Sequence, residues 1–156
     1  MFKFESNLKG AFDAKGIKCG IYELPDVPGG DFPADGPFDP VPTNAIVQSD
    51  QPIKVEVEFQ VSGALAAALC DYTWECAVLV EKWGCDEHCP DPAVVSFKHL
   101  PRKRHTYKQA VTLPANTFTP GYYKLVVCLN LISCNKKPMP VAGFCDLGPI
   151  KVYEAA

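Results

Sequence analysis

A strict alternation of apolar and polar residues constrains the fold of this chain more than any other feature. Over nine residues every second side chain is apolar and those between are charged or polar: Ile53, Val55, Val57, Phe59 and Val61 alternate with Lys54, Glu56, Glu58 and Gln60. Successive side chains of a β-strand point to opposite faces, whereas a helix repeats about every 3.6 residues. The segment is therefore predicted to be an antiparallel strand with one face in a core and the other in water.

Similar segments follow along the chain, separated by turn residues at intervals of about ten residues. We expect strands over residues 16–24, 72–83, 94–99, 107–113, 122–131 and 150–153, and a helical turn in the alanine-rich segment 63–69. No long helical pattern accompanies them. The sequence predicts an all-β protein, an antiparallel two-sheet sandwich with an immunoglobulin-like Greek key of about seven to eight strands. The Pro120-Gly121 turn and Tyr123 resemble the tyrosine corner of immunoglobulin-like sandwiches.

A proline-rich break divides the chain. Residues 25–42 hold six prolines, three glycines and four aspartates, a composition that excludes a helix or an inner strand. We expect an N-terminal strand and a Pro/Gly/Asp-rich arm or loop over residues 1–42, and the β-sandwich domain over residues 43–156. The arm is predicted to cross to a neighbouring subunit or to pair along an exposed sheet edge.

Eight cysteines are the second unusual feature. In a Greek-key order, the strands that hold Cys76 and Cys128 are antiparallel neighbours, so Cys70, Cys76, Cys128 and Cys134 are predicted to converge at one pole. Disulfides are the preferred chemistry for this cluster, with a tetrahedral zinc site or plain buried thiols as alternatives.

The remaining cysteines suggest two further sites. Cys85, His88 and Cys89 are three candidate metal ligands within five residues, although a short disulfide loop between Cys85 and Cys89 is the favoured alternative. Cys19 most simply pairs with Cys145 and ties the first strand to the last, but connectivity does not follow from one sequence.

Several function classes are disfavoured. None of the three histidines lies in a known hydrolase or metalloprotease motif, and there is no glycine-rich phosphate loop, so we expect no enzyme and no required cofactor other than the zinc alternative. A net charge of −3 argues against a nucleic-acid partner. No apolar run approaches the roughly 18 residues of a transmembrane segment. The N-terminus lacks a signal peptide, so we expect either a cytoplasmic protein or an exported one whose signal was removed.

The leading hypothesis is a non-catalytic interaction or structural module that binds a protein partner or itself, in preference to a small molecule. Leu79, Trp83 and Phe144 are predicted either to be covered by packing on the second face of the sheet, which is favoured, or to form a surface contact patch.

A second hypothesis rests on a resemblance. The Cys85-x3-Cys89-Pro90 segment, Tyr107, residues 125–129 and Cys145 are similar to secreted ML-type lipid-recognition domains. That resemblance implies an apolar cavity between two sheets and an apolar ligand, although the N-terminal segment and four further cysteines depart from the family. A metal-binding protein that uses the Cys/His cluster is the third hypothesis.

Overall fold

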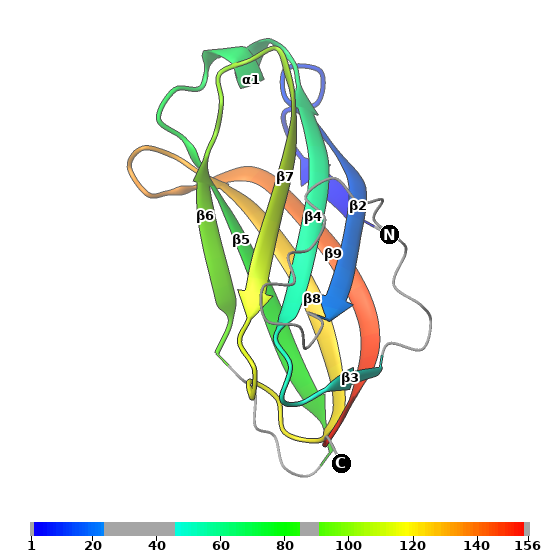
Figure 1. The fold of residues 1–156 in the computed structure, drawn as a ribbon. Helices are drawn as coiled ribbons and strands as arrows, with labels where there is room; N and C mark the ends of the chain where they lie inside the picture. The colour runs from blue at the N-terminus through cyan, green and yellow to red at the C-terminus, as the bar shows by residue number, and fades with distance from the viewer. Residues whose placement is uncertain (1, 24–45, 85–90, 155–156) are drawn as a thin grey trace.

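A computed structural model describes residues 2–23, 46–84 and 91–154, and it consists of two β-sheets packed face to face (Figure 1). In one sheet the strands lie in the order β1 (Phe2–Ser6), β9 (Pro138–Tyr153), β8 (Gly121–Ile132), β5 (Thr73–Trp83) and β6 (Ala93–Lys98), and β3 (Ile46–Gln48) pairs with β9. The other sheet has the order β2 (Asp13–Glu23), β4 (Ile53–Ser62), β7 (Arg104–Leu113). The prediction of an all-β two-sheet sandwich is therefore confirmed.

Alternating burial along the strands places every second side chain in the space between the two sheets. Strand β4 is central in the three-stranded sheet, and its burial alternates residue by residue from Ile53 to Ser62, as predicted. Strands β5 and β8 lie next to each other in the six-stranded sheet and alternate in the same way. The predicted helical turn is the short helix α1 (Ala64–Ala68), which follows β4 at one end of the sandwich.

Aromatic rings fill the interior. The Phe59 ring stacks on Tyr107 and meets Trp74 edge-on, with a centroid separation of 5.0 Å in both pairs. Phe4 and Phe12 extend this cluster, because both rings also contact Trp74. Offset and edge-on ring pairs are favourable beyond the area they bury, so this cluster stabilises the contact between the two sheets.

The tyrosine corner that the sequence suggested has its expected hydrogen bond. The Tyr123 hydroxyl donates to the backbone carbonyl of Thr119 at 2.8 Å, and it lies 2.9 Å from the Thr119 Oγ1. Such a bond holds the turn before the strand against the strand itself.

The N-terminal residues belong to the sandwich. Strand β1 pairs with β9, and β2 pairs with β4, so the first 23 residues contribute an edge strand to each sheet. The expected arm over residues 25–42, and the domain boundary at its end, lie outside the described residues and stay predictions.

Three strands differ from expectation. Strand β9 begins at Pro138, not near Ile150, and β1 and β3 were not predicted. The first part of β9 was not predicted because it contains prolines, which lack a backbone donor and are therefore unusual within strands. In the structure Pro138 lies at the start of the strand, and Pro149 lies next to a register shift between Lys124 and Val126 of β8. Strand β3 also runs parallel to β9, whereas only antiparallel pairs were expected.

A glycine allows the two N-terminal strands to approach. A Cβ atom at Gly16 would lie 2.5 Å from the Cγ atom of Phe2. We expect Gly16→Ala to lower the free energy of unfolding by about 1–3 kcal/mol, because the ring of Phe2 must shift. Urea denaturation measures this loss. Combining Gly16→Ala with Phe2→Leu should produce less than the sum of the two losses, and an unchanged midpoint for Gly16→Ala would contradict this packing.

Candidate functional site

The outer face of the six-stranded sheet is unusually apolar. Seven of the eight large apolar side chains that are exposed among the described residues lie on strands of this sheet, and only Ile17, on β2, lies on the other. The seven are Ile46, Leu79, Trp83, Val94, Tyr122, Phe144 and Tyr153. Contiguous exposed apolar surface on a folded domain marks a site of interaction.

Strand register aligns part of this set in one band. Ala77 of β5 pairs with Val94 of β6 and with Cys128 of β8, and Cys128 pairs in turn with Phe144 of β9. Leu79 and Val126 form the next cross-strand pair. Directly paired residues point to the same face of a sheet, so these side chains are neighbours on the surface. We call this set the apolar band; it consists of Ala77, Leu79, Val94, Val126, Cys128 and Phe144.

A second row of exposed side chains crosses the sheet farther from α1. Trp83 of β5 pairs with Tyr122 of β8, which pairs with Lys151 of β9. The Lys151 Nζ lies 5.8 Å from the centroid of the Tyr122 ring, a cation–π geometry. Trp83 and Tyr122 are each about half exposed. This aromatic row presents flat rings to solvent.

Charged residues lie between the apolar band and the aromatic row, and one of them, Asp146, also pairs directly with Val126 of the band. Glu81 pairs with Lys124, whose Nζ lies 3.1 Å from the Asp146 Oδ2. A hydrogen bond from the Gly148 backbone amide, together with Lys124, lowers the pKa of the Asp146 carboxyl. These groups form a charged strip beside the apolar centre of the outer face.

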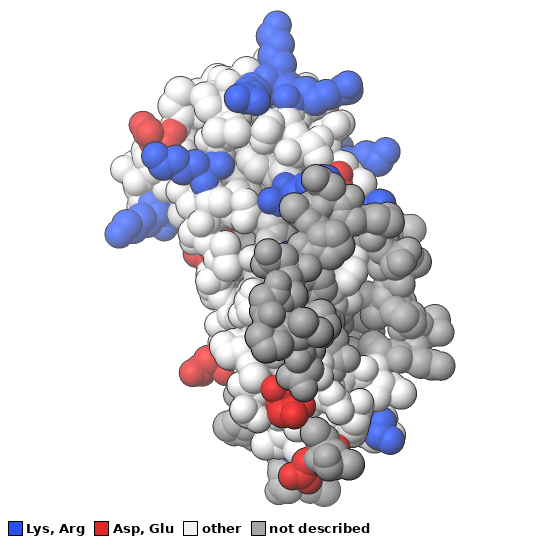
Figure 2. All heavy atoms as spheres, viewed as in Figure 1, with Lys and Arg blue, Asp and Glu red and all other residues white. Residues whose placement is uncertain are grey.

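The outer face of the three-stranded sheet has a different character. The outward residues of β4 are Lys54, Glu56, Glu58 and Gln60, and Lys54 forms an ion pair with Glu56 at 2.6 Å. Figure 2 shows the charge distribution from this side, with Lys and Arg side chains gathered at the end that holds α1. Arg102, Lys103 and Arg104, three consecutive basic residues that lead into β7, are all exposed. The two sheets therefore present chemically distinct outer surfaces.

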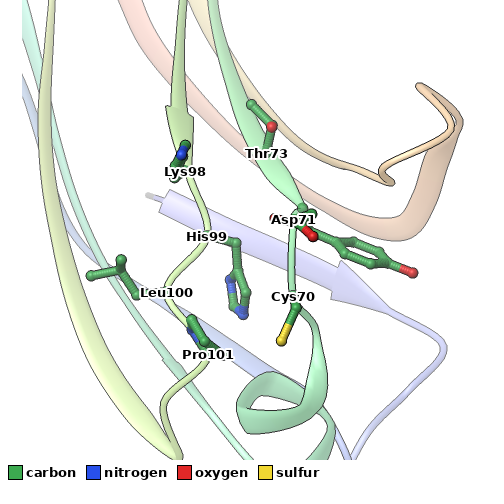
Figure 3. Close-up of a pocket in the computed structure, with 8 residues that line it drawn as sticks. Cys70, Asp71, Thr73, Lys98, His99, Leu100 and Pro101 are labelled. Atoms are coloured by element: carbon green, nitrogen blue, oxygen red, sulfur yellow. The ribbon is translucent and has the colours of Figure 1, made fainter.

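A depression of about 330 Å³ lies at the α1 end (Figure 3). Its walls come from the segment before β5, with Cys70 and Asp71, and from the end of β6 and the residues that follow it, with Lys98 and His99. A second depression of about 420 Å³ shares Asp71 and Thr73 with the first and is also lined by Cys134. Cys70 and Cys134, both exposed, thus lie at the same end of the sandwich.

His99 is the buried polar group beside the first depression, and both of its ring nitrogens are engaged. The Nε2 lies 2.8 Å from the Ala66 carbonyl oxygen, which only a protonated nitrogen can satisfy. The Nδ1 accepts from the Trp74 indole N–H at 3.3 Å and lies 3.2 Å from the Tyr107 hydroxyl. His99 therefore joins α1 to the aromatic interior and has no free nitrogen for a reaction.

The four cysteines expected at one pole do not form a cluster. Cys76 faces the interior, where burial raises the pKa of its thiol to about 12, while Cys128 lies on the outer face. Their strands are antiparallel neighbours, as expected, but Cys128 pairs with Ala77, so the two thiols fall on opposite faces of the sheet. Within the described ranges no three His, Cys, Asp or Glu side chains converge as metal ligands. Cys85, His88 and Cys89 lie outside these ranges, and that site stays a prediction.

The structure does bring Cys19 and Cys145 together. They come from β2 and β9, on opposite sheets, and their thiols are hydrogen-bonded to each other. This proximity matches the pair that the sequence suggested, with both cysteines as free thiols here.

One expectation about the outer face of the six-stranded sheet was wrong, and several of its residues were not predicted. Packing on the second face was expected to cover Leu79, Trp83 and Phe144, but all three are exposed. The other members of the band were not identified as surface contacts. The register between strands adds Val94, Val126 and Cys128 to the apolar band. The alternation within one strand does not show which residues of neighbouring strands lie beside it. In the described part of the chain, no helix has the length and apolarity to cross a membrane.

Comparisons with known proteins agree with the fold. No family model matches the chain, and no curated protein does. Among solved structures, the crystal structure of the C-terminal domain of Wzt is similar over 99% of this chain and 80% of that one, with 12% identity and a TM-score of 0.50. A Niemann-Pick type C2 protein from Japanese carpenter ant is similar over 97% of this chain and 99% of that one, with 13% identity and a TM-score of 0.42. At such identities the likeness to the Wzt domain shows a shared β-sandwich fold and nothing finer.

The hydrogen bonds of His99 predict a stability effect. We expect His99→Leu to lower the free energy of unfolding by about 2–4 kcal/mol, because the Trp74 N–H and the Ala66 carbonyl lose their buried partner. The matched control is His105→Leu, at a less buried histidine on β7, which should lose less than about 1 kcal/mol. Thermal or urea denaturation compares the two variants, and equal losses would show that His99 has no special structural role.

Proposed function

We propose that this protein is a non-catalytic binding module that docks on a protein partner through the apolar band of its six-stranded sheet. The observation that carries the proposal is the alignment of Val94, Ala77, Cys128 and Phe144 in a cross-strand row over four neighbouring strands. Leu79 and Val126 widen this row, and charged side chains first appear at its β9 and β1 side, where Asp146 pairs with Val126 and Lys3 pairs with Phe144.

The composition of the outer face favours a protein as the partner. The centres of protein interfaces are depleted of charged residues and enriched in aromatic ones, and a polar rim surrounds them. The apolar band matches such a centre, and the strip of Glu81, Lys124 and Asp146 matches such a rim. Trp83 and Tyr122, beyond this strip, are residue types that frequently dominate binding energy.

The interior offers weaker support for a ligand site. An apolar carrier needs space between its sheets, but the rings of Phe59, Trp74 and Tyr107 lie in mutual contact there. This packing supports a site on the outside of the sandwich over one between the sheets. The engagement of both ring nitrogens of His99 likewise supports binding without catalysis. The lipid-carrier and metal hypotheses stay predictions that no contact of the described residues favours.

Two equally exposed residues provide a matched test. Leu79 in the apolar band and Ile17 on the opposite sheet are each 42% exposed. We expect Leu79→Lys to reduce partner binding at least tenfold, because a charge in the centre of an interface must be desolvated, and Ile17→Lys to leave binding unchanged. Quantitative affinity capture from the source cells, read out by mass spectrometry, compares both variants with the unmodified chain.

Sedimentation velocity of the purified chain completes this test. A dimer that Leu79→Lys dissociates and Ile17→Lys preserves would identify a second copy as the protein partner. Both substitutions lie at exposed positions, so unchanged denaturation midpoints should accompany them. If Leu79→Lys captures the same proteins at the same strength and leaves the oligomeric state unchanged, the apolar band is not the binding surface.

A further inference from the structure

Two cysteines from different sheets face each other inside the sandwich. Cys19 of β2 pairs with Val57 of β4, and Cys145 of β9 pairs with Val127 of β8. Both valines are fully buried, and directly paired residues share a face, so both cysteines point into the space between the sheets. Their thiols form a hydrogen bond across that space.

The position of the pair differs from that of every other described cysteine. Strand β2 is an edge strand of its sheet, and β9 lies one strand from the edge of the other, so the pair lies near the side of the sandwich (Figure 1). Cys19 is partly exposed, whereas Cys145 is almost fully buried. By contrast, Cys76 and Cys128 lie on opposite faces of one sheet.

Hydrogen bonding polarises the two thiols in opposite directions. The bond from Cys19 lowers the pKa of the Cys145 thiol, while the same bond and burial raise the pKa of Cys19. Exchange also depends on access, so the partly exposed Cys19 is the thiol that a small disulfide reaches first, while the lowered pKa of Cys145 favours it as the thiolate of the second step.

We propose that Cys19 and Cys145 are a modification site that closes into an inter-sheet disulfide by exchange with a low-molecular-weight disulfide such as glutathione disulfide. The Cys19 thiol loses its proton to solvent, and its sulfur attacks one sulfur of glutathione disulfide, forms a mixed disulfide and releases one glutathione thiolate. That thiolate takes the Cys145 proton, and the Cys145 sulfur then attacks the Cys19 sulfur and releases the second glutathione thiolate, which takes up a proton from solvent in place of the one that Cys19 lost. Two protein thiols are oxidised, and one glutathione disulfide is reduced to two glutathione molecules.

Closing this bond changes the sandwich in a defined way. The disulfide joins β2 of one sheet covalently to β9 of the other. The bond also encloses most of the chain in one loop, and cross-links that close long loops restrict the unfolded state most. Oxidation is therefore expected to stabilise the folded chain, because the two thiols are already neighbours across the two sheets.

The test uses the full chain, first reduced and then incubated with glutathione disulfide. Free thiols are blocked, and peptides are mapped by mass spectrometry without reduction. We expect a cross-linked pair of peptides that contain Cys19 and Cys145, and a higher urea midpoint for the oxidised chain than for the reduced one. Cys19→Ser should abolish both the cross-link and the shift in midpoint. Cys76→Ala, the control at a buried cysteine outside the pair, should preserve the cross-link.

Two results would overturn the proposal. One is that both Cys19 and Cys145 of the natively folded chain still react with the thiol-blocking reagent after incubation with glutathione disulfide. The other is a cross-link that joins either of them to a different cysteine, such as Cys70. Circular dichroism before and after oxidation verifies that the chain kept its β-structure. The Cys76→Ala control shows whether loss of the cross-link in Cys19→Ser is specific to that cysteine or follows from general misfolding.

Discussion

The contact of Phe59 with Trp74 and Tyr107 is the interaction on which the rest of the structure depends. These rings come from β4, β5 and β7, so they bring together strands of both sheets. His99 fixes the cluster at one end by hydrogen bonds to Trp74 and to the carbonyl of α1. Because rings occupy the space between the sheets, the surfaces that remain for recognition are the outer faces and the ends of the sandwich.

Local patterns predicted most of the fold. The alternation from Ile53 to Val61 is interpretable without tertiary information, because it matches only one backbone geometry. Strand β9 was not predictable in this way, since prolines break its pattern and irregular pairing with β8 accommodates them. The N-terminal strand β1 has too few residues for a clear period, and its place beside β9 depends on contacts between the two ends of the chain.

The candidate site was predictable only in part, for a related reason. Leu79, Trp83 and Phe144 could be assigned to outward positions from alternation alone, but whether anything covers them is a tertiary property. Register makes Cys128 the neighbour of Phe144 and separates it from Cys76. The same alternation places Cys145 directly behind Phe144, so β9 presents the apolar band on one face and the inter-sheet thiol on the other.

The central claim is that this sandwich binds on the outside of its six-stranded sheet and not between its sheets. Titration of the isotope-labelled chain with the apolar probe 8-anilinonaphthalene-1-sulfonate, followed by NMR, tests it most directly. We expect chemical-shift changes concentrated at Leu79, Val126 and Phe144, with little change at Phe59 and Tyr107. Changes concentrated at the two interior rings would contradict it and would indicate a cavity that opens between the sheets.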